Sequence, residues 1–297
     1  MMAQSLKSRR MLDAYLLVIP FLFLYIVFWL FPIIHGIWLS FFDLSLGRET
    51  FIGLENYLRV LFTDSIFFMS LKNVLIYAGM FTLGLVVSLL LALMISSSYL
   101  KSNRMKVLVQ AIIFLPWVVS WASLGLMWTW LLRSSLVDYL LGPFSNYLPF
   151  RLGVSPLSQT SAAIWILSSI VVWRNLGYNT VLFLVGLKAI PKEIIEASMI
   201  DGASSWIRFR RITLPLMKPM IVFVTITTII GTFQIYDPIR VMTDGGPAFT
   251  TTSPVHWAFK NVVDFGKIGY GSAVGTIIVA IVFVLNLLQY KVIKKYL

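Results

Sequence analysis

The chain has 297 residues, of which 59% are hydrophobic and 12% charged, with a mean hydropathy of +0.87 and a net charge of +12. Soluble globular proteins are roughly 45–50% apolar and about 25% charged, so the composition excludes a water-soluble fold and predicts an all-α protein that crosses a membrane several times. The absence of cysteine excludes disulfides and thiolate metal sites. We interpret the positive charge as a determinant of the orientation of the chain in a lipid bilayer, and we expect no nucleic acid as partner.

Six apolar stretches are long enough to cross a bilayer, whose hydrocarbon core needs about 20 helical residues. They lie at about 14–40, 73–97, 107–131, 162–187, 216–236 and 270–290. Pro32 is expected to kink the first span or to begin a change of direction, and Pro116 lies inside the third. The outer loops, at 43–71, 132–161 and 237–269, are expected to form short helices on the membrane surface.

The basic residues are unevenly distributed between the two sides of these spans. If the N-terminus is cytoplasmic, the inner segments carry 15 Lys and Arg against four acidic residues, and the outer segments carry eight of each. Cytoplasmic loops of membrane proteins are enriched in Lys and Arg. The sequence therefore predicts six transmembrane helices with both termini in the cytoplasm.

The inner segment at about 188–215, between the fourth and fifth spans, is too short to fold alone and strongly patterned. Pro191 suits the first turn of a helix, KEIIEASMI follows as a helix, and Gly202 marks its end or a close approach. SSWIRFRRI continues to Pro215, which is expected to open the fifth span. The pattern predicts a helix–turn–helix on the cytoplasmic surface, suited to a groove on a soluble partner. The alternative is a loop whose arginines only determine topology.

The order of residues in this segment resembles a known sequence motif. Glu196-Ala-Ser, three residues, Gly202, nine residues and Ile212-Thr-Leu-Pro resemble the EAA loop of ATP-binding cassette importer permeases, E-A-A-x3-G-x9-I-x-L-P. The single departure is Ser198 at the second alanine. IDGA at 200–203, LPLMKP at 214–219 and TDGGPAFTT at 243–251 resemble the carbohydrate branch, the maltose- and glycerol-phosphate-type permeases.

The resemblance covers essentially the whole chain and implies a type I ABC importer permease fold, with one transmembrane permease domain over 1–297. In that family the loop forms a coupling helix that docks on a separate ATPase. The implied coupling residues are Glu196, Ala197, Ser198, Asp201, Gly202, Ala203 and Arg210. The implied partners are a second homologous permease, a homodimeric or paired ATP-binding cassette ATPase that holds ATP and Mg, and an extracytoplasmic solute-binding protein. The implied location is the bacterial cytoplasmic (inner) membrane.

The sequence contains no pattern of catalytic residues. G-x-x-x-x-G-K-[ST], G-x-S-x-G and H-E-x-x-H do not occur, and Gly266-Lys267 lacks the rest of a phosphate-binding loop. We therefore expect no catalytic residue, metal ligand or cofactor on this chain, which would be a transport subunit rather than an enzyme. His35 and His256 have no partner visible in the sequence and are interpreted as structural.

Two polar clusters inside spans are candidates for substrate or pathway contact, because polar groups in a membrane are costly and often functional. They comprise Trp173, Arg174, Asn175, Tyr178 and Asn179 of the fourth span, and Gln234, Tyr236 and Asp237 at the end of the fifth. A sugar, an oligosaccharide or a related polyol or glycerol phosphate is the substrate class that the resemblance implies. The structural alternative is that Arg174 pairs with Asp237 or caps backbone carbonyls.

Other residues of the spans are interpreted as structural. Gly271-x-x-x-Gly275 is expected to serve helix packing, and Trp117, Trp121, Trp128 and Trp130 are interpreted as interfacial anchors without a role in transport. A proton-coupled secondary transporter that works without an ATPase is the alternative function. It would need an intramembrane carboxylate relay, but no acidic residue lies deep in a predicted span. A membrane-embedded enzyme would need a nucleophile, metal site or acid–base pair that the sequence does not offer.

Overall fold

The computed structural model describes residues 16–44, 49–96, 102–133, 139, 143, 151 and 153–294, and these are mostly helical. The chain divides into two compact units, a first unit of 1–64 with 258–277 and a second unit of 65–257 with 278–297. The sequence alone gave no sign of this division within the expected single domain. Several of the charged residues that were counted above for the two sides of the membrane lie outside the described residues. They are Lys7, Arg9, Arg10, Asp13, Arg48, Lys101, Asp138 and Lys295.

The first unit begins with a continuous helix, Leu16–Leu39, which contains a π-helical turn just before Pro32. Proline has no N–H, and its ring clashes with the carbonyl four residues earlier. The helix widens into a π-helical turn, η1 (Ile26–Leu30), where the Phe31 N–H donates to the Ile26 carbonyl, and α2 (Phe31–Leu39) follows with Pro32 in its first turn. Pro32 therefore marks a π turn within one continuous helix.

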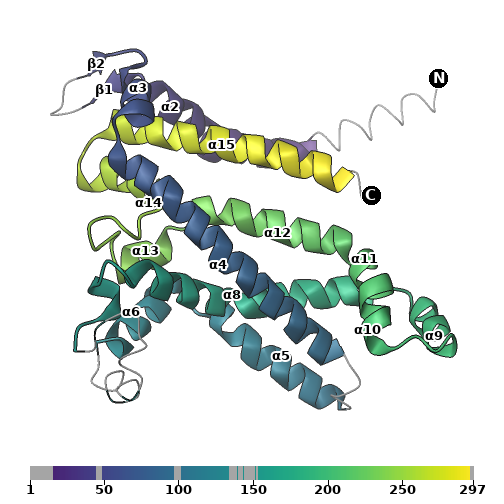
Figure 1. The fold of residues 1–297 in the computed structure, drawn as a ribbon. Helices are drawn as coiled ribbons and strands as arrows, with labels where there is room; N and C mark the ends of the chain where they lie inside the picture. The colour runs from purple at the N-terminus through teal and green to yellow at the C-terminus, as the bar shows by residue number, and fades with distance from the viewer. Residues whose placement is uncertain are drawn as a thin grey trace, which may run out of the picture. The chain divides into compact units, whose positions relative to one another are not determined.

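A hairpin and a short helix follow the first span (Figure 1). Strands β1 (Phe42–Asp43) and β2 (Thr50–Phe51) pair antiparallel, and α3 (Glu55–Phe62) comes next. The rest of the unit comprises the end of α14 (Pro254–Phe259), the π-helical η6 (Lys260–Asp264) and the start of α15 (Ile268–Lys294). A Cβ on Gly271 would lie 2.4 Å from a methyl carbon of Val262, whereas one on Gly275 would meet nothing within 4 Å. Of the two glycines predicted to serve helix packing, Gly271 is therefore in close contact with a neighbour in this chain and Gly275 is not.

The second unit is built around α4 (Ser65–Ser96) and α8 (Ala163–Lys188), which pack along much of their length (Figure 1). Tyr77 of α4 and Leu167 and Phe183 of α8 are buried in its two hydrophobic clusters. Helix α5 (Asn103–Val118) crosses α8 so closely that a Cβ on Gly177 would lie 2.2 Å from the Ile113 carbonyl oxygen. Glycine at 177 is what permits this backbone contact.

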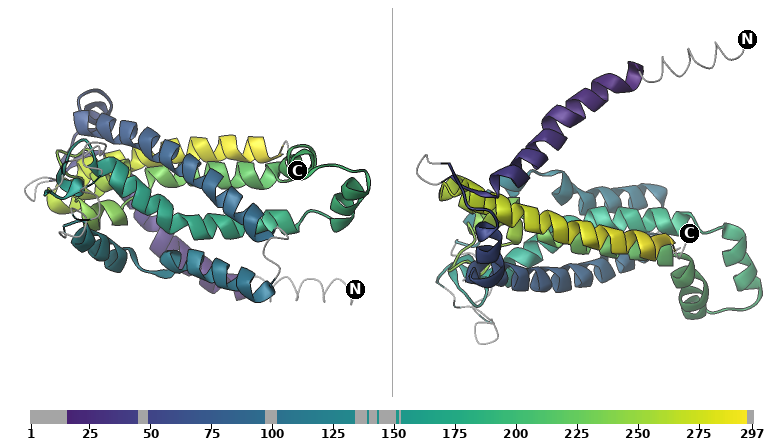
Figure 2. Two further views of the ribbon diagram at one scale, coloured as in Figure 1. Left: turned by 60° about the horizontal axis from the view of Figure 1, so that its bottom comes forward. Right: turned by 90° about the horizontal axis from the view of Figure 1, so that it is seen from above.

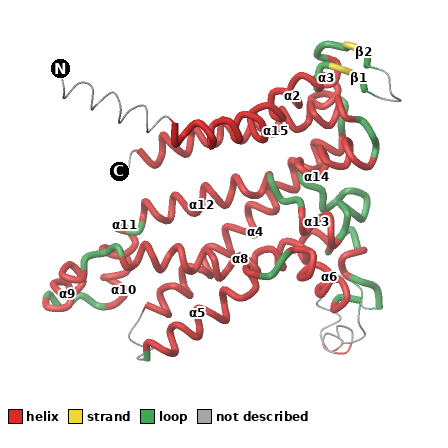
Figure 3. The backbone as a smooth tube through the Cα atoms, turned by 180° about the vertical axis from the view of Figure 1, so that it is seen from behind, coloured by secondary structure: helices red, strands yellow, loops and turns green. Residues whose placement is uncertain are grey.

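The third predicted span is broken in two, as Figure 3 shows. Helix α5 ends at Val118, Val119 and Ser120 are extended, and α6 (Trp121–Leu131) leaves at 93°. The Ser120 hydroxyl accepts a hydrogen bond from the Ser123 N–H at the new helix start. The predicted third span at about 107–131 therefore covers two helices, and the break between them follows shortly after Pro116.

The fifth predicted span is also bent. The helical stretch Ser205–Leu216 meets α12 (Lys218–Phe233) at 64°. The span therefore opens at Lys218, with Pro219 in its first turn, and Pro215 lies in the preceding single turn α11 (Leu214–Leu216). Pro215 therefore lies just before the bend, about one helical turn ahead of the start of α12.

Among the residues that the structure describes, four helices are long and apolar enough to cross a membrane, and there are six such spans if each bent pair counts as one. The four are Leu16–Leu39, Ser65–Ser96, Ala163–Lys188 and Ile268–Val292. The second begins at Ser65 rather than at the expected 73, since its first turns were assigned to an outer loop. Short helices do occur in the loops predicted to be outside: α3, η4 (Pro156–Ser158), α13 (Asp237–Met242) and α14.

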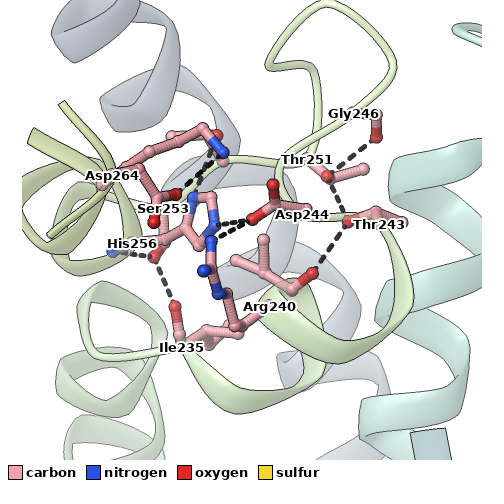
Figure 4. Close-up of polar contacts among 12 residues, drawn as sticks. Ile235, Arg240, Thr243, Asp244, Gly246, Thr251, Ser253, His256 and Asp264 are labelled. Carbon is pink, nitrogen blue, oxygen red and sulfur yellow. Dashed lines mark hydrogen bonds and ion pairs between the residues drawn. The ribbon is translucent and has the colours of Figure 1, made fainter. Parts of the chain in front are cut away.

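The outer loop after α13, residues 243–253, is held by a dense set of polar contacts (Figure 4). The Thr243 and Thr251 hydroxyls lie 2.8 Å apart, and Thr251 donates to the Gly246 carbonyl. His256 is fully buried, with Nε2 3.4 Å from an Asp244 carboxylate oxygen that Arg240 contacts at 2.6 Å. His256, which we interpreted as structural, therefore has a partner that the sequence does not reveal, because Asp244 comes from a loop 12 residues earlier.

Candidate functional site

A cavity of about 290 Å³ lies within the second unit, among α4, α5, α6, α8, α12 and the start of α13. Its polar and aromatic lining residues are Phe81, Trp117, Trp121, Arg174, Asn175, Tyr178, Asn179, Thr227, Thr228, Gln234, Tyr236 and Asp237. Two segments separated by more than 45 residues of sequence, 171–179 and 227–238, therefore face one space. Ligand pockets are typically about 300–1,000 Å³, so the volume of this cavity lies at the small end of that range.

Arg174 joins the fourth span to the break in the third. Its guanidinium donates to the carbonyls of Trp117 (3.0 Å) and Val119 (3.1 Å), which α5 leaves without helical partners. The same group lies over two indole rings, 4.8 Å from the centre of Trp117 and 4.4 Å from that of Trp121. Of the two structural alternatives for Arg174, the carbonyl cap is the one that the structure contains.

Trp117 and Tyr178 form an aromatic wall of the cavity. Their rings stack with centroids 4.4 Å apart and planes inclined by 16°. Tyr178 lies one helical turn after Arg174 on α8, so both side chains reach the same part of α5. A flat pair of aromatic rings beside hydrogen-bonding groups is an arrangement on which a sugar ring can pack.

Further polar side chains of the cavity wall come from α8 and from the segment where α12 ends and α13 begins. Asn175 Nδ2 donates to the Val171 carbonyl of its own helix at 2.7 Å, and Asn179 is buried. Gln234 follows the last residue of α12, and Tyr236 and Asp237 lie where α13 begins. Of the charged side chains that the structure describes in this lining, Arg174 is the one cation and Asp237 the one anion.

Trp173 does not belong to this group. It lies on another side of α8, with its ring edge-on to that of Trp128 at 5.5 Å, and lines a separate apolar cavity of about 600 Å³ beside α5 and α6. Adjacent residues of a helix point about 100° apart. Trp173 therefore lines this second cavity and is not among the residues that line the first one with Arg174.

Sequence reasoning missed several lining residues. Trp117 and Trp121 were interpreted as interfacial anchors, yet both face the cavity, together with Phe81, Thr227, Thr228 and Gly231. The signal was present in LPWVVSW at 115–121, where Pro116 and Ser120 interrupt an apolar run and each is followed directly by a tryptophan. Such an interruption predicts a broken helix whose aromatic residues turn inward.

The inner segment forms the predicted pair of helices. Helix α9 (Lys192–Ile200) begins after Pro191 and ends in a Schellman motif, in which the Gly202 N–H donates to the Met199 carbonyl and the Ala203 N–H to that of Ser198. Gly202 has a φ of +74°, and a Cβ there would meet nothing within 4 Å in this chain. Its conformation, rather than crowding within the chain, favours glycine at this position.

The second helix of the segment, α10 (Ser205–Arg208), is tied back to the first. The Ser204 hydroxyl caps α10, and Arg208 donates to the Ala203 carbonyl at 2.8 Å. Figures 1 and 2 show α9 and α10 projecting beyond the ends of α4, α8 and α12. The element is therefore a shaped protrusion rather than a loose loop.

Most of the predicted coupling residues lie on the surface of this protrusion. Glu196, Ala197, Asp201, Gly202 and Arg210 are exposed, and Ala203 is half-buried. Ser198 is buried, and its hydroxyl donates to the Ile195 carbonyl, so it faces the chain itself. Large apolar side chains are exposed beside the charges, with Ile200 87% and Trp206 66% accessible. Among the described residues, no three His, Cys, Asp or Glu side chains gather as a metal site requires.

Comparison with known proteins identifies relatives over the whole length. Residues 84–297 match the family described as binding-protein-dependent transport system inner membrane component. The trehalose/maltose transport system permease protein MalF of Thermococcus litoralis is 33% identical over 98% of this chain and 97% of its own. The lactose permease protein LacF of Rhizobium radiobacter is 32% identical over 96% and 95%. The sn-glycerol-3-phosphate permease protein UgpA of Yersinia pestis is 30% identical over 95% and 94%.

The fold also matches solved structures. A chain of a bacterial ABC transporter for import of the acidic polysaccharide alginate superposes with a TM-score of 0.82 at 22% identity, covering 97% of this chain and 96% of that one. The expected type I ABC importer permease fold is therefore confirmed. The chain belongs to the family of inner-membrane components of binding-protein-dependent transport systems, and its location in the inner membrane follows.

Proposed function

We propose that this member of the binding-protein-dependent transport family forms, with a second homologous permease, the path by which an ATP-driven importer admits a neutral sugar or oligosaccharide. The observation that carries the proposal is the cavity with the stacked Trp117 and Tyr178 beside Asn179, Gln234 and Asp237. Aromatic faces bind the apolar faces of sugars, and amides and carboxylates bind their hydroxyls. Relatives named for trehalose/maltose and lactose transport support the same class.

The charges of the cavity favour an uncharged substrate over a glycerol phosphate. Arg174 is its one described cation, and it already donates to two backbone carbonyls. Phosphate recognition ordinarily uses cationic or backbone donors directed at the ligand. A single carboxylate, Asp237, also faces the space and would repel an anion.

The energy for transport is proposed to come from a separate ATPase that holds ATP and Mg. The protrusion formed by α9 and α10 is the docking element, with exposed Glu196, Ala197, Asp201, Gly202 and Arg210 at its surface. Because α9 connects directly to α8 and α10 leads into α12, force on the protrusion would reach both helices that line the cavity. An extracytoplasmic solute-binding protein would deliver the substrate.

The test is uptake into proteoliposomes that contain both permeases and the ATPase, with the binding protein outside. We expect uptake of labelled maltose, trehalose or lactose, with none of glycerol 3-phosphate, and a requirement for ATP in the compartment that holds the ATPase. Uptake driven by a proton gradient without ATP would instead establish the secondary transporter.

A steric variant tests the cavity itself. A Cβ on Gly231 would meet nothing within 4 Å, and Gly231 lines the cavity. Gly231→Ala is therefore expected to keep uptake and Gly231→Phe to abolish it, with both variants assembling normally. Full uptake by Gly231→Phe would refute the assignment of the cavity to the pathway.

A further inference from the structure

Helix α3 of the first unit has two different faces. Asn56 and Val60 are buried against the unit. Leu54, Leu58, Leu61 and Phe62 are 61%, 56%, 45% and 74% exposed. At 3.6 residues per turn these four lie within an arc of about 100°, so they form one continuous apolar face.

The position of α3 relative to the first span is determined by buried hydrogen bonds. Asn56 Nδ2 donates to the Ser40 carbonyl at 2.9 Å and to the Phe42 carbonyl at 3.1 Å. Tyr57 adds a contact between its hydroxyl and that of Ser40. Ser40 caps α2, the end of the apolar helix Leu16–Leu39. Helix α3 is therefore held beside the end of this span.

Aromatic residues continue from the span to the hairpin beside α3. The Trp38 ring lies 5.3 Å from that of Phe42, and Phe42 lies 5.4 Å from Phe51. Trp38 and Phe51 are both exposed. Exposed aromatic residues at the end of a span are typical of the boundary between acyl chains and headgroups.

The charged residues of α3 lie beside the apolar face and not within it. Glu55 and Arg59 are exposed, and the Arg59 guanidinium lies 5.4 Å from the centre of the Tyr270 ring. Tyr270 in turn donates to Asp64. A helix with a broad apolar face, flanking charges and a location at the membrane boundary has the properties of an interfacial helix.

We infer that the apolar face of α3, together with Phe51, inserts into the headgroup–acyl boundary of the outer leaflet. The occupant of this face is the phospholipid bilayer. Its effect is to hold the outer end of the first span at a constant depth, because Asn56 and Tyr57 link α3 to Ser40. A membrane anchor of this kind is independent of the substrate and of the ATPase.

The absence of cysteine from the chain makes a direct test simple. Leu58→Cys, Phe62→Cys and Thr63→Cys would each be labelled with a nitroxide, in the full complex in phospholipid vesicles. Thr63 is exposed and lies roughly opposite the apolar face, so it is the matched control. Collision of each label with oxygen, which partitions into lipid, is compared with collision with a water-soluble nickel chelate.

We expect labels at 58 and 62 to collide more with oxygen than with the chelate, and the label at 63 to show the reverse. Easy access of the chelate to 58 and 62 would overturn the inference, because the face would then lie in water. Protection of 58 and 62 from both reagents would also overturn it, because a protein surface would then cover the face. Normal ATP-dependent uptake by each labelled variant establishes that the fold is retained.

Discussion

The Arg174 guanidinium donates to the carbonyl of Trp117 and lies 4.8 Å from the centre of the same residue's indole ring. One side chain of the fourth span thus satisfies the backbone of a broken helix and orients an aromatic wall of the cavity. A charge that the sequence places inside a membrane is therefore a structural element of the site as well as a candidate contact.

Arg174→Ala is expected to destabilise the protein, because it leaves the Trp117 and Val119 carbonyls without a donor. An unsatisfied buried acceptor costs about 1–3 kcal/mol, and because these two hydrogen bonds are part-buried and exposed we expect the lower end of that range. The loss would appear as a lower Tm of the detergent-purified chain. Asn175→Ala is the control, since Asn175 lines the same cavity but donates to its own helix. Equal Tm values for the two variants would show that the cap contributes nothing.

Trp117→Leu and Tyr178→Leu are each expected to weaken sugar uptake, because either change removes half of a stacked pair. Aromatic pairs contribute about 0.5–1.5 kcal/mol beyond their buried area, which corresponds to a rise in the apparent KM of roughly 2- to 13-fold. Trp130→Leu is the control, because Trp130 is 72% exposed and lies on the neighbouring α6. A KM that Trp130→Leu changes as much as Trp117→Leu would contradict the role of the cavity.

Gly202→Asn is expected to keep the fold and to lose coupling. Asparagine tolerates a positive φ better than other non-glycine residues, and nothing in this chain lies within 4 Å of a Cβ at 202. A docked ATPase would approach that open space and meet the new side chain. The measurement is ATPase activity stimulated by the loaded binding protein, alongside co-purification of the ATPase with the tagged chain. Unchanged stimulation in Gly202→Asn would remove Gly202 from the docking surface. Gly266→Asn is the matched control, because Gly266 also has a positive φ, of +65°, and nothing lies within 4 Å of a Cβ there.

Tyr77→Phe is expected to loosen the outer loop 243–253. The Tyr77 hydroxyl is buried and donates to the Thr251 carbonyl at 2.6 Å, and Asn73 donates to the Thr252 carbonyl at 2.9 Å. Loss of one such bond leaves a buried carbonyl unsatisfied, at about 1–3 kcal/mol. Hydrogen exchange of residues 250–253 should therefore become faster in Tyr77→Phe, with α8 as the internal reference. Unchanged protection of the loop would show that the remaining contacts suffice.

The sequence by itself determined the class of the protein, the number of apolar stretches and the form of the inner segment. Helix α9 begins and ends at the residues that Pro191 and Gly202 predict. These features depend on composition and on contacts between residues close in sequence, such as the first turn of a helix or a Schellman motif. Local chemistry of this kind can be derived without knowledge of the neighbouring elements.

The tertiary structure alone decided which residues share the cavity. Trp117 enters it because α5 breaks at Val119, whereas Trp173 lies outside it and lines the separate apolar cavity beside α5 and α6. His256 finds Asp244 only because the loop between them folds back. Hydropathy reports how apolar a helix is, but it contains no information on the rotation of that helix against its neighbours. The packing of backbones and side chains sets that rotation, and with it the composition of the site.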